Sequence, residues 1–529
     1  MKKVSVLIVG GGPLGMTASA LLSQYGVDSL MVDKRSSLDN HPRARLYDAI
    51  SLELFRQLGC ADEIEATGLG AAWTQQNPVF ITMKEGPIAK AYTREFYSVD
   101  RKITPQRPVM SCQDYLEPIL WKTANESEFS ELREHSEVFD LVQDENGCRA
   151  KIRDLSTGEV EEIAADYVIG ADGTKSYVRE VMGANMEGEY RDHYFRDVLF
   201  EADLEPYHQG HIGGLLFVRH GKATALYQPI DGKNRWRAQV PTREKTDYTP
   251  EEAIEWIKKT TGAGDELDIN VQSILYWRVT AQTSTKYGDQ RMYLLGDAAQ
   301  IFTPTGGMGM NTAWAGAYNL IWKLAYVIKG HAPASILDTY EEEWKPQAYR
   351  RTRVAMANAD SAGAMYRAYE AGEGFEEAVN SFYQYASYTG VIFGYELESD
   401  LLQKDTEHKP ALGIENQQYI PIVRSGRRLP HVWIDEAANK SIYDWFGFDY
   451  VLALGEGANE AEWVEAVEAI RAQGFPIRIE HLPNQQYTPL DHEQAILIRP
   501  DRIVAAHWKK VEEAPKDLLA RYLPLKDKA

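Results

Sequence analysis

A glycine-rich turn between a strand and a helix is the feature that most restricts how this chain can fold. Val4–Val9 is a largely aliphatic run, typical of a parallel strand that is buried on both faces, and it leads directly into a GxGxxG motif. Gly10 permits the tight turn, and Gly12 allows the backbone to approach a pyrophosphate. Gly15 allows the following helix, predicted over Met16–Tyr25, to pack closely on the strand.

An acidic residue stands where a dinucleotide-binding unit needs one. A second predicted strand, Ser29–Val32, ends at Asp33, about 20 residues after the glycines, and a carboxylate at that spacing accepts hydrogen bonds from a ribose. A glycine turn alone is weak evidence, because such turns also serve packing. Strand, glycine loop, helix, second strand and acid together predict an α/β fold with a Rossmann-like domain that binds a dinucleotide.

Two later segments each contain an apolar strand that ends in a pair of glycine and aspartate. Tyr167–Arg179 contains Asp172 in an Asp-Gly pair, followed by the start of a helix. Met292–Ala299 contains Asp297 in a Gly-Asp pair, and Thr303–Asn311 adds a glycine-rich loop before a long helical pattern. Each segment alone is compatible with an ordinary turn.

In this order and spacing, the three segments resemble the fingerprints of the FAD-dependent aromatic hydroxylases typified by 4-hydroxybenzoate hydroxylase, over roughly residues 1 to 350. The sequence is more similar to the polyketide hydroxylases, such as aklavinone 11-hydroxylase, through His41–Ala44, Ser111–Leu120 and Pro304–Met308. Gln300 and Thr303 depart from the family, which often has histidine and a second proline there. These departures bear on local flavin mobility and not on FAD binding.

The resemblance implies contacts with FAD, position by position. Asp33, with Arg35 beside it, is expected to hold the adenosine ribose. Arg43 and Gln113 are expected to contact the pyrophosphate and ribityl region, and Asp297 to bind ribityl or pyrophosphate oxygens. The expected FAD-binding residues are Gly10, Gly12, Pro13, Gly15, Asp33, Lys34, Arg35, Arg43, Gln113, Asp172, Asp297, Pro304, Gly307, Met308, Gly309, Met310 and Asn311.

The glycine-rich loop has a further expected task. Gly306, Gly307 and Gly309 can expose backbone N–H groups at the start of the helix that follows. The partial positive charge of that helix end would stabilise an anionic reduced flavin. A turn made only for packing is the alternative.

Asp172 is expected to be structural or close to the nicotinamide, because the Asp-Gly motif of the family lies near both cofactors.

The resemblance implies a monooxygenase with NADPH or NADH as co-substrate. In the family the nicotinamide reduces FAD, O2 adds to give a C4a-hydroperoxide, and one oxygen atom passes to a phenolic or polyketide-type ring. The sequence has no second strand–GxGxxG–helix unit, which agrees with transient nicotinamide binding. Three alternatives stay open: a hydroxylase of a small phenol or pyridine-type ring, an FAD epoxidase or reductase acting on a non-phenolic substrate, and a flavin-binding regulatory protein without turnover.

The chain is long enough for several domains. The predicted domains are an FAD-binding domain of residues 1–75 with 111–184 and 286–345, a β-sheet substrate domain of 76–110 with 185–285, a helical connection of 346–395, and a domain of 396–529 that resembles a thioredoxin-like fold. The last segment contains no cysteine, so dithiol exchange is excluded. We expect it to support the structure or to contact a second subunit, for example in a homodimer.

Three side chains are predicted to line the substrate pocket: Tyr227, Arg237 and Arg367. Gln239 and Tyr366 are further candidates. An arginine beside a phenol would lower the pKa of the hydroxyl electrostatically. A packing or surface role is the alternative for each of these side chains, and no residue is assigned as the catalytic base.

Composition limits the partners. A formal net charge of −21 opposes binding to nucleic acid or to an anionic membrane surface. The three widely spaced cysteines offer neither a disulfide framework nor a metal site, and they favour a reducing compartment, the cytoplasm. No apolar run approaches the roughly 20 residues that span a bilayer. We therefore expect an aromatic substrate and O2 as small-molecule partners, and no nucleic acid, membrane or metal.

Overall fold

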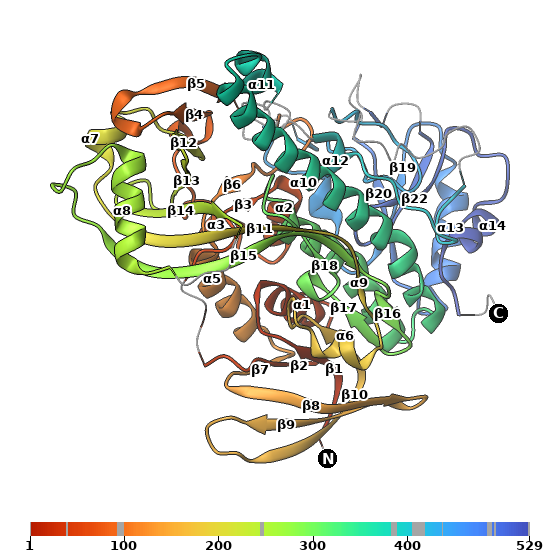
Figure 1. The fold of residues 1–529 in the computed structure, drawn as a ribbon. Helices are drawn as coiled ribbons and strands as arrows, with labels where there is room; N and C mark the ends of the chain where they lie inside the picture. The colour runs from red at the N-terminus through yellow and green to blue at the C-terminus, as the bar shows by residue number, and fades with distance from the viewer. Residues whose placement is uncertain are drawn as a thin grey trace.

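The computed structural model contains three larger sheets and the helices that cover them (Figure 1). The described residues are 2–36, 38, 41–92, 100–243, 248–381, 389–404, 418–435, 437–483, 489–490 and 493–526. The amino-terminal sheet lies at the bottom of this view, the second sheet at the upper left, and the carboxyl-terminal sheet at the right.

The first sheet is largely parallel and is built around the amino-terminal strand. Its strands follow the order β16–β17–β10–β1–β2–β7, and the hairpin β8–β9 pairs with β10. The strands are β1 (Lys2–Val9), β2 (Ser29–Val32), β7 (Ser130–Arg133), β8 (Ser136–Asp144), β9 (Gly147–Asp154), β10 (Val160–Gly170), β16 (Gly288–Asp289) and β17 (Met292–Leu294). Val6, Leu7 and Ile8 of β1 are fully buried, as predicted for a strand covered on both faces.

Three helices pack together beside this sheet: α1 (Pro13–Gln24), α5 (Gln113–Asn125) and α9 (Met308–Ile328). α1 begins earlier than the sequence predicted, because Gly12 is its N-cap and Pro13 stands in the first turn, where the missing N–H costs no helical hydrogen bond.

The second sheet is mainly antiparallel, in the order β18–β15–β11–β14–β13–β12–β4–β5. Its strands are β4 (Gln76–Phe80), β5 (Pro87–Tyr92), β11 (Met186–Glu201), β12 (Leu216–His220), β13 (Ala223–Pro229), β14 (Arg235–Thr242), β15 (Asn270–Ser284) and β18 (Gln300–Ile301). β18 comes from the segment predicted for the FAD-binding domain, so the first two sheets share a stretch of chain.

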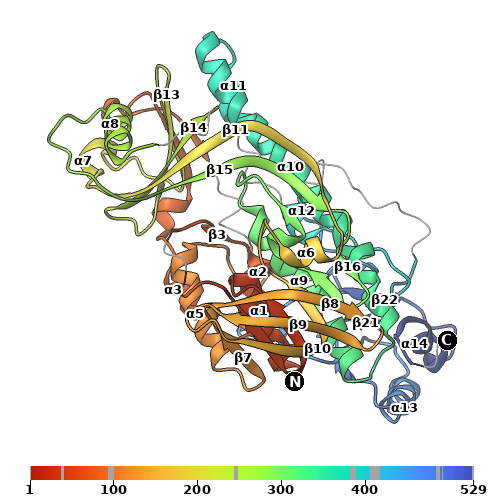
Figure 2. The ribbon, with the colours of Figure 1, turned by 60° about the horizontal axis from the view of Figure 1, so that its bottom comes forward.

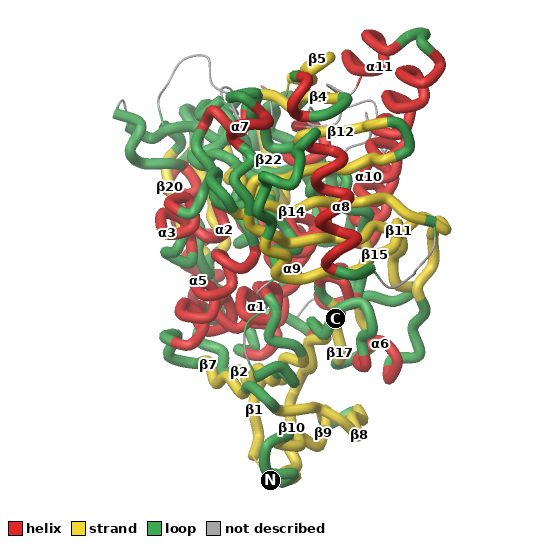
Figure 3. Tube along the Cα trace, turned by 60° about the vertical axis from the view of Figure 1, so that its left-hand side comes forward, coloured by secondary structure: helices red, strands yellow, loops and turns green. Residues whose placement is uncertain are grey.

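Helices cover both faces of the second sheet. α8 (Pro250–Thr261) lies across the outer face, where Trp236 and Ile257 are buried between helix and strands (Figure 3). The long helix α10 (Thr339–Ala371) runs beside β11 and β15 (Figure 2) and packs on the inner face through Met356 and Met365. The predicted helical connection is thus mainly one helix.

The carboxyl-terminal sheet has the order β20–β19–β21–β22. Its elements are β19 (Tyr450–Leu454), α13 (Glu460–Arg471), β20 (Ile477–His481), β21 (Ala495–Ile498), β22 (Val504–Trp508) and α14 (Pro515–Tyr522). β19 and β20 are parallel and joined through α13, whereas β21 is antiparallel to both β19 and β22. This confirms the predicted thioredoxin-like arrangement.

Short elements connect the sheets. They are β3 (Leu46–Tyr47), β6 (Val109–Met110), α2 (Ala49–Gln57), α3 (Ala61–Ala66), α6 (Tyr177–Val181), α7 (Glu205–His208), α11 (Phe375–Ser381) and α12 (Thr389–Phe393). β3 pairs with β6, and α2 packs against α9. Because β3 and α2 follow one another directly, both lie beside the start of α9.

Candidate active site

The glycine-containing segments meet at one edge of the first sheet. β10 pairs in parallel with β1 on one side and with β17 on the other, so that Gly170 is aligned with both Val9 and Leu294. β2 is parallel to β1, with Val32 opposite Val9. The residues that follow these four strands therefore lie side by side, at the edge where open α/β sheets bind ligands.

The amino-terminal glycines meet two different demands. Gly10 has a φ of 108°, and a Cβ there would lie 2.4 Å from the carbonyl oxygen of Ala171. A Cβ on Gly15 would lie 1.9 Å from the carbonyl oxygen of Gly10, so packing within the protein requires glycine at both positions. Around Gly12, in contrast, no described atom lies within 4 Å of a Cβ position. This side of the turn is open to a ligand.

The start of α1 can bind an anion. Gly12 is its N-cap, Pro13 follows, and no described side chain caps the helix. The N–H groups of a first helical turn have no partner within the helix, and the helix dipole makes this end partly positive. A phosphate group at the open side of Gly12 would satisfy them. The geometry thus fits the pyrophosphate of a dinucleotide.

Asp33 holds the glycine turn as well as facing the edge. Its Oδ2 accepts a hydrogen bond from the backbone N–H of Gly11 at 2.5 Å, and its Oδ1 accepts one from the N–H of Arg35 at 2.7 Å. The Arg35 guanidinium donates to the carbonyl oxygen of Gly11 at 3.0 Å. No role was assigned to Gly11 from the sequence, although a Cβ there would lie 2.8 Å from that of Asp33. Lys34 is exposed.

Asp172 has a structural task. Its Oδ2 accepts hydrogen bonds from the backbone N–H groups of Tyr177, at 2.7 Å, and Val178, at 3.1 Å, at the start of α6. Arg179 of the same helix donates to the carbonyl oxygen of Ala298 at 3.0 Å, which ties the Asp-Gly segment to the Gly-Asp segment. These contacts agree with the structural alternative stated for Asp172.

Asp297 presents a carboxylate at this edge. The Gly296 before it has a φ of 63° and packs against Leu14, so the turn points the aspartate outward. The side chain of Asp297 is exposed, and water screens its charge. Desolvation by the surrounding protein nevertheless raises its pKa to about 6, against the lowering effect of Arg43. Arg43 is itself exposed.

Gln113 connects α5 to the loop that carries Arg43. Its backbone N–H donates to the carbonyl oxygen of Ala44 at 2.9 Å, and its side-chain Nε2 donates to Glu117 at 2.6 Å. The Oε1 atom accepts a long hydrogen bond of 3.4 Å from the N–H of Ala44. Gln113 is buried, so its contact with a cofactor stays a prediction while its role in fixing this loop is visible.

The glycine-rich loop ends at the start of α9. Gly306 and Gly307 have φ values of 91° and 63°, and Gly307 is the N-cap of a helix that no described side chain caps. Pro304 is exposed, Met308 is buried, and Gly309 and Met310 are half-buried. The N–H groups of the first turn of α9 have no partner within the helix, and their contact with a cofactor stays a prediction.

The side chain of Asn311 is bound within the protein. Its Nδ2 donates to the carbonyl oxygens of Leu46, at 2.9 Å, and Gly307, at 2.7 Å. Its Oδ1 accepts from the N–H of Asp48, at 2.9 Å, and the hydroxyl of Ser51, at 2.8 Å. These four bonds satisfy both ends of the amide, so its side chain joins the glycine loop to α2 instead of facing a cofactor.

Gln300 and Thr303, the two departures from the family, face the protein. Gln300 is buried, and its Oε1 accepts a hydrogen bond of 2.8 Å from the hydroxyl of Tyr287. Thr303 is buried, with its hydroxyl 3.5 Å from that of Thr305. Both side chains therefore help to hold the strand and loop that precede α9.

Family models match both ends of the chain. One for an FAD binding domain matches residues 3–355, and one for the C-terminal region of aromatic-ring hydroxylases matches residues 423–523. The chain belongs to the FAD-dependent aromatic-ring hydroxylases. The predicted family, the FAD cofactor and the monooxygenase class are thereby confirmed. The edge of the first sheet described above lies within the residues that the FAD-binding model matches.

Relatives cover the hydroxylase from end to end. Aklavinone 12-hydroxylase RdmE of Streptomyces purpurascens is 30% identical over 97% of this chain and 96% of its own. The 4-methyl-5-nitrocatechol 5-monooxygenase of a Burkholderia species is 27% identical over 98% and 96%. A crystal structure of aklavinone-11 hydroxylase with FAD and aklavinone matches with a TM-score of 0.85 and 27% identity, over 100% of both chains.

Arg237 of the hydroxylase lies on the inner face of the second sheet. It is buried, and its Nε lies 2.6 Å from Oδ1 of Asp197. Its Nη1 donates to the carbonyl oxygen of Arg43 at 3.0 Å, which ties the second sheet to the loop beside the FAD site. Arg237 therefore sits between the two predicted domains, but its charge is balanced by Asp197.

Gln239 shares this inner face. It is one strand residue beyond the outward-facing Ala238, so its side chain points the same way as that of Arg237. It is 3% exposed, and its Nε2 has no hydrogen-bond partner among the described residues. An amide donor buried in this way needs an acceptor.

Tyr227 and Arg367 do not reach the inner face. Tyr227 is fully buried on the outer face, and its hydroxyl is hydrogen-bonded to Thr260 of α8. Arg367 is exposed on α10. Tyr227 points outward because side chains alternate along β13 and the neighbouring Leu226 takes the inner position. Both side chains therefore lie away from the face that carries Arg237 and Gln239, and a pocket role for either stays a prediction. Tyr366 packs on Phe217, with ring centroids 6.3 Å apart.

Other predictions concern partners. No described helix has both the length and the apolar character needed to cross a membrane. Within the described ranges, no three His, Cys, Asp or Glu side chains are grouped so that they could hold a metal ion.

Proposed function

We propose that this hydroxylase inserts one atom of O2 into a phenolic ring of a polyketide-type substrate, with NADPH or NADH as the reductant. The observation that carries the proposal is the meeting of the GxGxxG, Asp-Gly and Gly-Asp segments at one sheet edge, beside a second sheet whose buried Gln239 amide has no partner among the described residues. Relatives that act on aklavinone support the substrate class, because they match nearly the whole chain.

FAD supplies the redox chemistry of the reaction when it is bound, and the protein supplies binding, orientation and electrostatics. The N–H groups at the start of α1, beside Gly12, would hold the pyrophosphate. Asp33 already accepts four hydrogen bonds, from the N–H of Gly11 and from the backbone and guanidinium of Arg35, so ribose hydroxyls would take the place of the guanidinium. Asp297 would accept from ribityl hydroxyls, and Arg43 would turn toward the phosphates. The N–H groups after Gly307 would face the isoalloxazine.

The inner face of the second sheet would hold the aromatic substrate. Gln239 Nε2 would donate to a hydroxyl or carbonyl oxygen of the ring system, which would satisfy the amide. Phe217 and Leu226, on the same face, supply apolar contact. Polyketide-type aromatics carry several ring oxygens, so a donor within an apolar wall matches their chemistry. Arg237 would act through its position beside the loop of Arg43, because Asp197 neutralises its charge.

Oxygen transfer and reductant consumption can be measured together. We expect the purified protein to be yellow, to oxidise NADPH faster when a suitable aromatic is added, and to give a product that carries 18O from 18O2. Measurement of NADH in parallel identifies the preferred nicotinamide. A colourless protein after reconstitution with FAD, or ligand-stimulated NADPH oxidation without labelled product, would contradict the proposal.

A small phenol is the second candidate substrate. The nitrocatechol monooxygenase relative matches this chain over nearly the same length and is named for a single-ring substrate. The two candidates are distinguished by comparing single-ring and multi-ring phenols in the same assay. A higher kcat/KM for single rings would assign the hydroxylase to the second class.

A further inference from the structure

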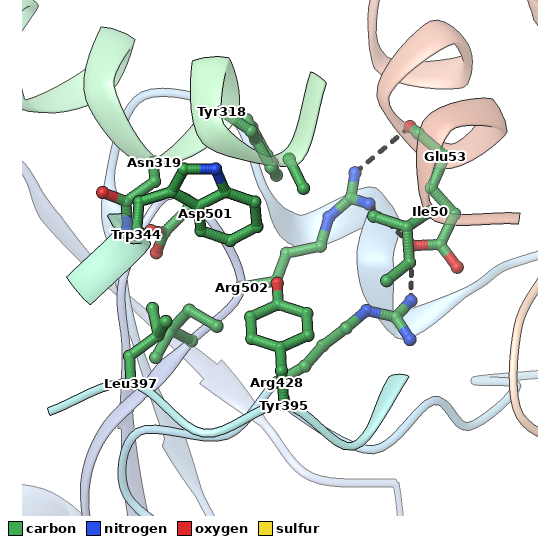
Figure 4. Close-up of a pocket in the computed structure, with 12 residues that line it drawn as sticks. Ile50, Glu53, Tyr318, Asn319, Trp344, Tyr395, Leu397, Arg428, Asp501 and Arg502 are labelled. Atoms are coloured by element: carbon green, nitrogen blue, oxygen red, sulfur yellow. Dashed lines mark hydrogen bonds and ion pairs between the residues drawn. The ribbon is translucent and has the colours of Figure 1, made fainter. Parts of the chain in front are cut away.

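Two arginine side chains of the thioredoxin-like domain bind one carboxylate on α2 (Figure 4). Arg502 Nη1 lies 3.1 Å from Oε2 of Glu53, and Arg428 is paired with the same oxygen. The relative exposures of Glu53, Arg428 and Arg502 are 1%, 3% and 4%. The contact is therefore shielded from solvent, in contrast to a surface ion pair, whose attraction is weakened by solvent.

Arg502 adopts a backbone conformation that favours glycine. Its φ is 65°, in the turn between β21 and β22, where its N–H donates to the carbonyl oxygen of Arg499 at 2.9 Å. Residues other than glycine are disfavoured at such a positive φ. A strained backbone conformation persists where the surrounding contacts hold it in place. The side-chain contacts of Arg502 with Glu53 hold it here.

α2 connects the ion pairs at Glu53 to the glycine loop of the proposed FAD site. The first turn of α2 is held by Asn311, which accepts hydrogen bonds from Asp48 and Ser51 and donates to the carbonyl oxygen of Gly307. Leu46, just before α2, packs so closely on Gly307 that a Cβ there would lie 2.9 Å away. A short helix moves as one body, so a shift of α2 at Glu53 would displace the loop.

We propose that Arg502 is a positioning residue for the flavin loop: it holds α2 at Glu53, and α2 fixes Gly307 through Asn311. The proposal rests on FAD binding at that loop, as proposed above. It gives the thioredoxin-like domain a task that needs no thiol.

The domain is docked independently of Arg502. Arg499 Nη1 lies 2.7 Å from Oε1 of Glu343 on α10, and Lys323 of α9 lies 2.8 Å from Oε2 of the same carboxylate. All three side chains are buried. Without Arg502, Glu53 would keep Arg428 as its partner, so no buried carboxylate would be left unpaired. A substitution at 502 should therefore leave the domain in place.

Arg502→Gly and Arg502→Asn test the proposal in the full-length protein, because both residues tolerate a φ near 65° and neither can reach Glu53. We expect hydrogen–deuterium exchange of residues 46–52 and 306–312 to rise about fivefold without FAD, and the Kd for FAD to rise by a similar factor. Relief of the strained turn offsets part of the lost contact with Glu53, so the melting temperature should fall only slightly. Ala438→Gly, at a φ of 54° in another turn of this domain, is the matched control and should change none of these.

Unchanged exchange in both segments for both variants would overturn the proposal. Faster exchange across β19–β22, with a large fall in the melting temperature of both variants, would also overturn it, since Arg502 would then only stabilise its own domain. If wild-type protein failed to bind FAD, the proposed function would fall, whereas exchange of residues 46–52 without FAD would still report whether Arg502 holds α2.

Discussion

Arg237 on β14 and Asp197 on β11 form a buried ion pair on the inner face of the second sheet, with 2.6 Å between Nε and Oδ1. Burial alone would raise the pKa of Asp197, but Arg237 and His41 together lower it to about 2. A depressed carboxyl pKa stabilises the fold above the unfolded value of 3.8, and this contribution is lost as the pH falls toward 2.

Asp197→Asn should destabilise the protein by roughly 3–5 kcal/mol at pH 7, because it leaves the Arg237 charge buried and uncompensated. The difference between variant and wild type in the free energy of unfolding should narrow between pH 4 and pH 2, where wild-type Asp197 takes up its proton. Urea unfolding at pH 7 and near pH 3 measures this. A difference that is constant with pH would show that the pair does not titrate in this way.

Gly12→Val should abolish FAD retention while leaving the fold intact. The backbone of Gly12, with a φ of −74° and a ψ of −179°, suits valine, and no described atom obstructs the new side chain. The side chain would occupy the path of the pyrophosphate, and we expect a loss of at least a hundredfold in affinity, about 2.7 kcal/mol. Flavin absorbance after purification and the melting temperature report the two effects. Gly15→Val, which would clash with Gly10, should instead unfold the protein.

Asp297→Asn tests the Gly-Asp segment through pH. If ionised Asp297 accepts hydrogen bonds from FAD, binding should weaken as the pH falls through about 6, where this carboxyl gains a proton. The asparagine variant should bind FAD more weakly at pH 7.5 and show a flat profile over this range. Fluorescence titration with FAD gives the Kd at each pH. Equal Kd values for both proteins at pH 7.5 would remove Asp297 from the site.

Gln239→Leu should separate substrate binding from stability. It removes an amide donor that is buried without a described partner, so the free energy of unfolding should rise by about 1 kcal/mol. Loss of a hydrogen bond to the substrate should raise KM up to about tenfold with FAD affinity unchanged. Gln228→Leu, which removes an acceptor 3.3 Å from Arg237, is the control. An unchanged KM in the Gln239 variant would place the substrate elsewhere.

Tyr227→Phe should leave kcat and KM unchanged. The hydroxyl bonds to Thr260 on the outer face, so its removal should cost only about 1 kcal/mol of stability. Steady-state kinetics with any accepted aromatic, together with thermal unfolding, checks both values. A clear fall in kcat would mean that the outer face of the sheet takes part in the reaction.

Much of the FAD site could be predicted because its signals are local. A strand that is buried on both faces, a turn that requires glycine and a helix that begins with proline each depend on neighbouring residues, as Gly10 and Pro13 illustrate.

The sequence by itself determined the FAD-binding unit, the three glycine-containing segments and the run of strands, since propensity and periodicity act over a few residues. Only the tertiary structure decided which face of β13 meets the FAD side, so that Tyr227 points away from it. It likewise decided that Asn311 holds α2, and that Arg502 reaches Glu53. Each of these depends on strand register or on contacts between residues far apart in the chain, which no local pattern encodes.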